Sequence, residues 1–266
     1  GRPYVHADIH GLHFQPGTSN LFACSDGGLH RTTNGGASWQ ELQNGMNITQ
    51  YYKISTSDAD SVKYLAGAQD NGTHMRINGS SFDRVLGGDG MDNAIDLQNP
   101  NIMYGSSQYG NFNKSTNGGN NFNAAFDISN VLPMGNGAWV TPIELDPLNS
   151  TTVYIGYTRV YRSTDAGVNF SAVSNVLTGD DIQMLYVPRA NTDHVYARVS
   201  NSQFLYRSTN GAQNFSLIAS IPGSGTVTGV AVDDADEQHI WVTRSGYSAG
   251  QKVYESFNGG GSWTNI

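Results

Sequence analysis

Short apolar runs separated by turn residues recur along the whole chain. The runs are rich in Val, Ile, Tyr and Phe, and they come in groups of four, for example at 139–147, 152–157, 160–163 and 170–173. Four such runs predict a four-stranded antiparallel sheet. The same grouping occurs at 52–56, 63–67, 73–76 and 82–85, and at 227–232, 239–242, 252–255 and 263–266. No segment keeps a helical period, so the chain is predicted to be all-β.

One turn phrase repeats between the third and fourth runs of a group. It opens on Ser or Thr, has Asn or Asp two residues later, continues with small residues and closes on Trp or Phe. Its five copies span residues 32–39, 115–122, 163–170, 208–215 and 256–263. The Asn or Asp side chain is suited to accept backbone amide hydrogen bonds, while glycines take the positive φ angles of a tight reversal. The phrase is therefore interpreted first as a folding device.

The spacing of the phrase sets the number of units. Its Asn or Asp anchors stand at 34, 117, 165, 210 and 258, with gaps of 83, 48, 45 and 48 residues. A degenerate copy of the phrase at 76–82 divides the long gap, so six units of roughly 44 residues cover the chain. We expect one six-bladed β-propeller of four-stranded blades, spanning residues 1–266. The expected blades lie at about 4–44, 45–87, 88–130, 131–176, 177–221 and 222–266, and closure would require the sixth blade to pack on the first.

Composition and charge narrow the possible partners. There are 32 glycines, only 14% of residues are charged, and the net charge is -8. Many turns and an acidic balance fit an all-β fold and disfavour nucleic acid or an anionic membrane as partner. Cys24 is the single cysteine and is expected to be a small buried hydrophobe. The sequence shows no signal or membrane-spanning segment, and we expect a monomeric part of a longer secreted or cell-surface protein.

The repeated phrases resemble Asp-boxes, also called BNR repeats, of sialidases, sortilin-type receptors and xyloglucanase-type glycoside hydrolases. The resemblance covers the whole chain at the level of the repeat. It implies a propeller whose boxes lie on the outer rim, away from the face that binds ligands. Sialidase activity is disfavoured, because Arg159, Arg198 and Arg244 fall on neighbouring blades instead of forming a cluster around one carboxylate.

A finer resemblance lies in the first unit, at residues 23–31. This segment is similar to the part of xyloglucanase-type hydrolases in which an Asp, followed by Gly-Gly, an aromatic residue and Arg, is a catalytic carboxylate. The resemblance implies that role for Asp26, although one residue is missing after it and His30 replaces the aromatic residue. Those hydrolases place two propellers face to face, and this chain is expected to supply one. Inverting hydrolysis needs carboxylates about 6.5–9.5 Å apart.

The turns between second and third strands, together with the links between blades, gather at one end of a propeller. In this chain that end includes the links at 133–139 and 178–181 and is polar, acidic and aromatic. Aromatic faces stack on sugars, while carboxylates and amides bind hydroxyl groups. The candidate ligand-binding residues are Asp26, Asp70, Asn71, Asp89, Tyr109, Trp139 and Tyr247. Alternatively, Trp139 starts an inner strand and packs between blades, and the acidic residues only form turns.

Two sets of residues have the types that bind metal ions. Asp70, Asp89 and Asp92 lie near glycines and offer oxygen ligands for calcium; no other cofactor is expected. His6, Asp8 and His10 share one face if they belong to a strand, and they are ligand types that zinc accepts. Packing on an inner strand is the preferred interpretation for this second set. No metal ligand is therefore assigned.

Three functions remain open at this stage. The first is a non-catalytic module that binds a glycan or an extracellular protein through the polar end. The second is a glycoside hydrolase domain that uses Asp26 with Asp70 or Asp89. The third is a structural spacer. The lack of a complete catalytic set favours the binding module.

Overall fold

The computed structural model describes residues 4–46, 48–79, 81–124, 137–177, 180–200, 202–218, 221–247 and 249–266. Within them the chain is almost entirely strand and turn, with one short 3-10 helix at Gln108–Gly110. Parts of the expected binding end, at 133–136 and 178–179, lie outside the described residues. The all-β prediction is confirmed.

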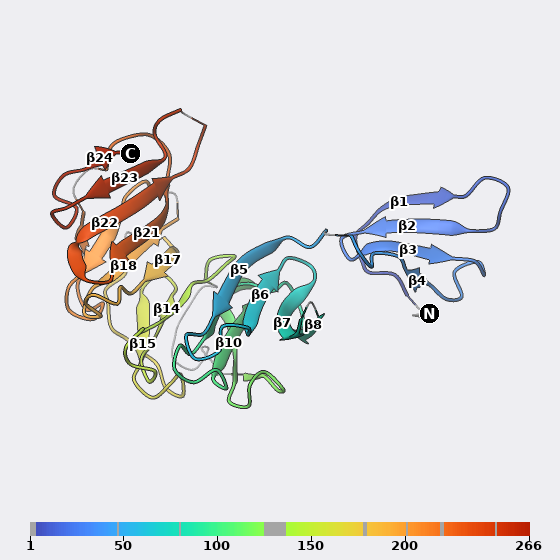
Figure 1. Ribbon diagram of the computed structural model, residues 1–266, viewed down its shortest axis with the longest axis horizontal. Helices are drawn as coiled ribbons and strands as arrows, with labels where there is room; N and C mark the ends of the chain where they lie inside the picture. Colours follow the sequence, from blue (N-terminus) through green and yellow to red (C-terminus); the bar gives the residue numbers. More distant parts are fainter. Residues whose placement is uncertain are drawn as a thin grey trace.

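The strands form six four-stranded antiparallel sheets in chain order (Figure 1). The first sheet is β1 (Ile9–Phe14), β2 (Leu21–Ser25), β3 (Gly28–Thr32) and β4 (Gln40–Glu41). The second is β5 (Tyr51–Thr56), β6 (Tyr64–Ala68), β7 (Gly72–Asn78) and β8 (Ser81–Leu86). The third is β9 (Asn93–Ile95), β10 (Met103–Ser107), β11 (Asn111–Ser115) and β12 (Asn123–Ala124).

The last three sheets have the same plan. The fourth is β13 (Ile143–Leu145), β14 (Val153–Gly156), β15 (Val160–Ser163) and β16 (Ser171–Ala172). The fifth is β17 (Ile182–Tyr186), β18 (Val195–Val199), β19 (Tyr206–Ser208) and β20 (Ser216–Leu217). The sixth is β21 (Val227–Asp233), β22 (Asp236–Arg244), β23 (Val253–Ser256) and β24 (Thr264–Asn265). Each strand pairs with its neighbour in sequence, as the six-unit repeat predicts.

The five repeated turns share one hydrogen-bond pattern. In the fourth sheet, Ser163 Oγ donates to Asp165 Oδ1 over 2.7 Å and accepts from the Gly167 amide over 2.8 Å. The Asp165 carboxylate also accepts from the amide of Asn169 over 2.8 Å. Equivalent bonds tie the turns anchored at residues 34, 117, 210 and 258. The repeated phrase therefore builds one turn five times.

Two consecutive residues after each anchor take the left-handed conformation. Glycines hold both positions in three turns, as at Gly118 and Gly119, with φ of 72° and 89°. Ala166 and Ala212 are forced into the same region, with φ of 56° and 68°. A side chain with a Cβ is strained there, so the turn imposes its geometry on these two alanines.

The degenerate copy of the phrase at 76–82 does not form this turn. The backbones of β7 and β8 remain paired from Arg76 with Phe82 to Asn78 with Ser81, so a tight hairpin replaces the wider reversal. Phe82 is 47% exposed, whereas the aromatic residues that close the other phrases are buried or half-buried. The shorter spacing between Asn78 and the aromatic residue accounts for the difference.

The hydrophobic core lies between successive sheets from the second to the sixth. One cluster joins Leu65 and Met75 of the second sheet to Ile95 and Met103 of the third. Three more clusters join the third sheet to the fourth, the fourth to the fifth, and the fifth to the sixth. Apolar packing between neighbouring sheets is how propeller blades are held side by side.

The first sheet is placed differently from the other five. In Figure 1 it lies at the opposite end of the molecule from the sixth sheet, and it approaches the second sheet at its tip. Leu12 and Phe14 of β1 are 59% and 69% exposed. The expected packing of the sixth unit against the first is therefore not present. The contact that the first sheet makes is polar and lies in its turns, as described below.

Cys24 corrects a second expectation. Its side chain is exposed, while the neighbouring Ala23 is 1% exposed and faces the interior. Successive side chains of a strand point to opposite faces, so burial of Ala23 turns Cys24 outward.

Candidate functional site

The tips of the first two sheets meet through side chains of their hairpin turns. Asn71, in the turn between β6 and β7, donates from Nδ2 to the backbone oxygen of Asp26 over 3.1 Å. His6, just before the first sheet, donates from Nε2 to the backbone oxygen of Asp70 over 2.9 Å. These two bonds bring the turn that carries Asp26 against the turn that carries Asp70.

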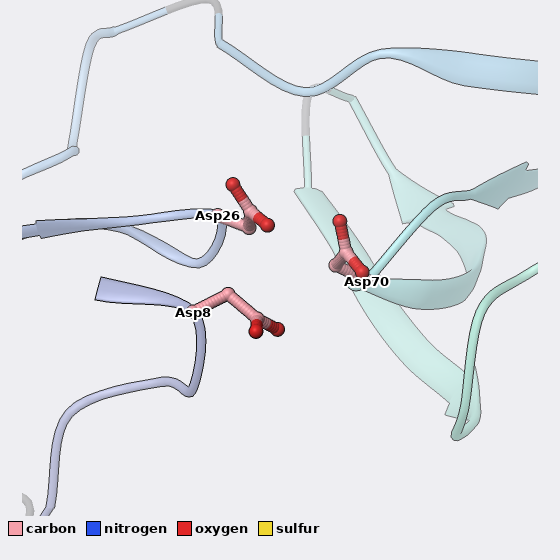
Figure 2. A group of neighbouring side chains, drawn as sticks. All are labelled: Asp8, Asp26 and Asp70. Atoms are coloured by element: carbon pink, nitrogen blue, oxygen red, sulfur yellow. The ribbon is translucent and has the colours of Figure 1, made fainter. Parts of the chain in front are cut away.

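Three carboxylates converge where these turns meet, and we call Asp8, Asp26 and Asp70 the acidic junction. Asp8, Asp26 and Asp70 each place an oxygen within 4.8 Å of the other two. Figure 2 shows Asp8 and Asp26 pointing across the gap toward Asp70. Burial raises the pKa of Asp70, and the negative charges of Asp89, Asp26 and Asp8 raise it further. Like charges this close favour the binding of a proton, a cation or a hydrogen-bond donor.

Hydrogen bonds hold two members of the acidic junction in place. His10 Nε2 lies 2.5 Å from Asp26 Oδ1. The Asp70 amide donates to Asp89 Oδ1 over 3.0 Å, which holds the turn of the second sheet to the link that follows β8. Asp8 and Asp70 have φ of 56° and 60°, a conformation that non-glycine residues rarely adopt. Strained residues of this kind cluster at ligand-binding sites.

An aromatic group adjoins the same turn. Tyr52 Oη donates to Gln69 Oε1, the neighbour of Asp70, and accepts from Trp139 Nε1 over 3.2 Å. Tyr109 packs edge-to-face on Trp139, with ring centroids 5.2 Å apart. Tyr109 and Trp139 are 46% and 38% exposed, so both present ring surface to solvent. We call Tyr52, Tyr109 and Trp139 the aromatic group.

Six of the seven predicted ligand-binding residues thus join one network. Asp26 and Asp70 belong to the acidic junction, and Asn71 and Asp89 are hydrogen-bonded to its turns. Tyr109 and Trp139 belong to the aromatic group. Tyr247 is fully exposed in the loop between β22 and β23, and none of its contacts among the described residues reaches this network. The alternative in which Trp139 starts an inner strand is wrong, because β13 begins at Ile143.

Asp92 lies elsewhere, in a pocket lined by residues of β5, β9, β13 and β17. It is 7% exposed and accepts from the backbone amides of Asn93 over 2.9 Å and Ile143 over 3.4 Å. Glu144 shares a cavity of about 300 Å³ with Asp92 and Lys53. Burial and the nearby Asp92 raise the pKa of Glu144 to about 8. This group is separate from the acidic junction, so the trio of Asp70, Asp89 and Asp92 is not assembled.

The histidine-rich start also departs from the expected strand pattern. β1 begins at Ile9, so His6 and Asp8 precede it and do not share a strand face with His10. The left-handed φ of Asp8 breaks the two-residue alternation. The acidic set that could hold a hard cation is therefore Asp8, Asp26 and Asp70, which differs from the sets considered in the sequence.

Tyr52 and Gln69 were not singled out from the sequence. Gln69 directly precedes Asp70 and Asn71, two predicted ligand-binding residues, and this position in the same turn is a sequence signal that could have identified it. Tyr52 lies on β5, and its bond to Trp139 joins residues 87 positions apart. A contact of that sequence separation follows from how the second and fourth sheets are placed, which the local pattern does not encode.

Comparisons with known proteins agree on the fold. No family model and no curated protein sequence matches the chain. Among solved structures, it is similar to the GH74 xyloglucanase from Xanthomonas campestris, with 17% identity, a TM-score of 0.68, and coverage of 100% of this chain and 46% of that one. The Niastella koreensis GH74 enzyme gives 19% identity, a TM-score of 0.66, and coverage of 100% and 46%.

A third similar structure is YCF48 bound to D1 peptide, with 12% identity and a TM-score of 0.58, covering 98% of this chain and 82% of that one. The chain therefore spans less than half the length of the two GH74 enzymes. At these identities the likeness establishes a propeller-type all-β fold resembling the propellers of glycoside hydrolases.

Proposed function

We propose that this chain is a carbohydrate-binding β-propeller module of a secreted or cell-surface protein, with Asp-box turns on its rim. Its binding site comprises the acidic junction of Asp8, Asp26 and Asp70 together with the aromatic group. In this proposal Trp139 and Tyr109 stack on the sugar ring, and the carboxylates accept hydrogen bonds from its hydroxyl groups.

The observation that carries this proposal is the hydrogen-bonded path from acids to aromatics. Gln69 bonds Tyr52, Tyr52 bonds Trp139, and Gln69 directly precedes Asp70 in the same turn. Exposed rings held beside clustered carboxylates are the combination that sugar binding uses. The fold likeness to GH74 enzymes supports this class of ligand.

Binding without catalysis fits the carboxylate spacing better than inverting hydrolysis does. The oxygens of Asp26 and Asp70 approach within 4.8 Å, whereas an inverting glycosidase holds its two carboxyl groups about 6.5–9.5 Å apart around the sugar and a water. This spacing disfavours inverting hydrolysis by this pair, whereas retaining glycosidases hold their carboxyl groups only about 5–5.5 Å apart. Asp89 does not supply the missing partner, since it is bonded to the Asp70 amide.

Hydrolysis remains the second candidate because of the likeness to GH74 enzymes, whose chains are more than twice as long. Peptide binding is the third, since a similar structure is described as bound to a peptide. Among the described residues no helix has the length and apolar character needed to cross a bilayer. We expect the chain to act as a monomer and to need no cofactor, with calcium as a ligand to be tested.

A glycan array and a sugar-release assay with the recombinant chain test these candidates. The proposal predicts glycan binding by the wild type and by Asp26→Asn, with no sugar released by either. Release of sugar that Asp26→Asn abolishes, with an unchanged unfolding midpoint, would establish the hydrolase instead. An array without any bound glycan would remove carbohydrate as the ligand.

A further inference from the structure

A second cavity is lined by residues of the first and second sheets. Its volume is about 460 Å³, within the roughly 300–1,000 Å³ range of small-molecule sites. Its walls include Tyr4, His30, Gln43, Tyr51, Phe82 and Arg84. His6, Gly27 and Asn71 also line it, so it continues from the site proposed above.

Arg84 supplies a free cationic group in this cavity. It lies on β8 opposite His74 of β7, and its guanidinium makes no hydrogen bond or ion pair with any described residue. His74 is already engaged, because its Nδ1 and Tyr51 Oη share a hydrogen bond of 3.0 Å. An unengaged guanidinium presents a planar set of donors that matches a carboxylate in bidentate fashion.

Two polar side-chain atoms on the first-sheet side of the cavity are covered and lack hydrogen-bond partners among the described residues. His30 is 3% exposed, and its Nδ1 has no hydrogen-bond partner within the described part of the chain. The same holds for Gln43 Oε1. Buried polar atoms that lack partners destabilise a folded protein. Neither atom is itself accessible in the cavity, so the side chains of His30 and Gln43 contribute to its polar wall.

Aromatic side chains complete the cavity. Phe82 and Arg84 are two residues apart on β8, so their side chains lie on the same face of the strand. Tyr51 and Phe82 are 41% and 47% exposed although both line the cavity. Their rings offer an apolar surface beside the cationic group, as a sugar ring with a charged substituent requires.

Glu41 is the one wall residue of opposite sign. Its Oε1 accepts from Gln43 Nε2 over 3.2 Å and lies 4.0 Å from His30 Nε2. It is held on the side of the first sheet, paired in register with His30. A carboxylate of a ligand would therefore be directed away from Glu41 and toward Arg84.

We propose that this cavity is a subsite for an acidic sugar, a uronic acid residue whose carboxylate pairs with Arg84. The ring stacks on Tyr51 and Phe82, and its hydroxyl groups lie on the side of the cavity formed by His30 and Gln43. This inference rests on the proposed carbohydrate-binding function and extends it, since it gives the glycan a charged unit.

The test compares a galacturonic acid oligosaccharide with an uncharged cello-oligosaccharide of equal length by titration calorimetry. The wild type is expected to bind the acidic ligand at least tenfold more tightly at low salt, and Arg84→Gln is expected to abolish that preference. Arg84→Lys keeps the positive charge but lacks the paired donors of the guanidinium, so it should retain only part of the preference for the acidic ligand. Glu41→Gln removes the repulsion and should strengthen acidic binding a few-fold. Arg84 is exposed, so these variants should keep the wild-type unfolding midpoint.

Equal affinity of the wild type for both oligosaccharides would overturn the subsite, as would an acidic preference that survives in Arg84→Gln. A Trp139→Ala variant separates this failure from failure of the proposed function. If Trp139→Ala weakens both ligands while Arg84→Gln changes neither, carbohydrate binding stands and the acidic subsite falls. If Trp139→Ala leaves both affinities unchanged, the proposed site itself is wrong.

Discussion

The side-chain amide of Asn71 donates a hydrogen bond to the backbone carbonyl of Asp26, and this 3.1 Å contact joins the tips of the first two sheets. No hydrophobic cluster joins these two sheets among the described residues, whereas apolar clusters hold every later pair. The arrangement of the acidic junction therefore depends on polar contacts between turns.

Asn71→Ala should loosen the first sheet from the rest. Loss of this bond costs about 1 kcal/mol, the typical net value of a protein hydrogen bond. Hydrogen exchange followed by mass spectrometry should show faster exchange in residues 4–32 and unchanged exchange in the fourth to sixth sheets. A uniform increase along the chain would contradict this, because it would mean that the sheet contact is not local.

Asp8→Asn should raise the unfolding midpoint at neutral pH. It removes one of three charges that lie within 4.8 Å of one another, and relief of partly exposed like charges is worth about 0.5 kcal/mol. Calcium should raise the midpoint of the wild type more than that of the variant, since the ion neutralises the same repulsion. A wild-type midpoint that does not respond to millimolar calcium would remove calcium as a ligand.

Asp165→Asn should flatten the acid dependence of stability. Hydrogen bonds from the amide and side chain of Asn169 and from Ser163 hold the pKa of Asp165 at about 2, below its unfolded value. The stabilisation from this carboxylate is therefore fully present above the unfolded pKa near 4 and is lost as pH falls through about 2. Asn holds the same position in the four sister turns, so the variant should fold.

Midpoints measured between pH 5 and pH 2 check the Asp165 prediction. The wild type should lose more stability across that range than Asp165→Asn. Parallel curves for the two proteins would show that the turn does not depend on the carboxylate charge.

Ala166→Gly should stabilise the protein by about 0.5 kcal/mol. Ala166 has φ of 56°, and the left-handed cost of a Cβ there exceeds the extra chain entropy that glycine loses on folding. Chemical denaturation gives the free energy of unfolding. Ala37→Gly is the matched control, since Ala37 lies in a sister turn without a positive φ and should lose stability. A loss of stability in both variants would refute the strain argument.

The sequence predicted the repeated parts of the molecule well because their determinants are local. The Ser, Asp and glycine positions of residues 163–167 bond one another within a few residues, and the strands around them are short apolar runs bounded by turn residues. The placement of the first sheet was not predictable in this way. Its contacts through His6 and Asn71 join residues 64 and 45 positions apart and involve backbone oxygens, which leave no pattern in the side chains.

The candidate site was predicted in part for the same reason. Asp70 and Asn71 were found because turn chemistry marks the loops at the end of a sheet. Tyr247 shares that chemistry, yet its loop extends into solvent without joining the network. Asp8 was assigned to a strand face, and only its left-handed backbone brings it to the acidic junction.

The most direct test of the account is the affinity of the cello-oligosaccharide for Trp139→Ala and Tyr247→Ala, measured by titration calorimetry against the wild type. Both changes remove one exposed aromatic ring, but only Trp139 belongs to the aromatic group beside Asp70. Loss of a stacking ring is worth about 1 kcal/mol or more, a several-fold change in affinity. We predict that Trp139→Ala weakens binding at least fivefold and that Tyr247→Ala leaves it unchanged. Equal affinities for all three proteins, or a loss confined to Tyr247→Ala, would contradict the proposed site.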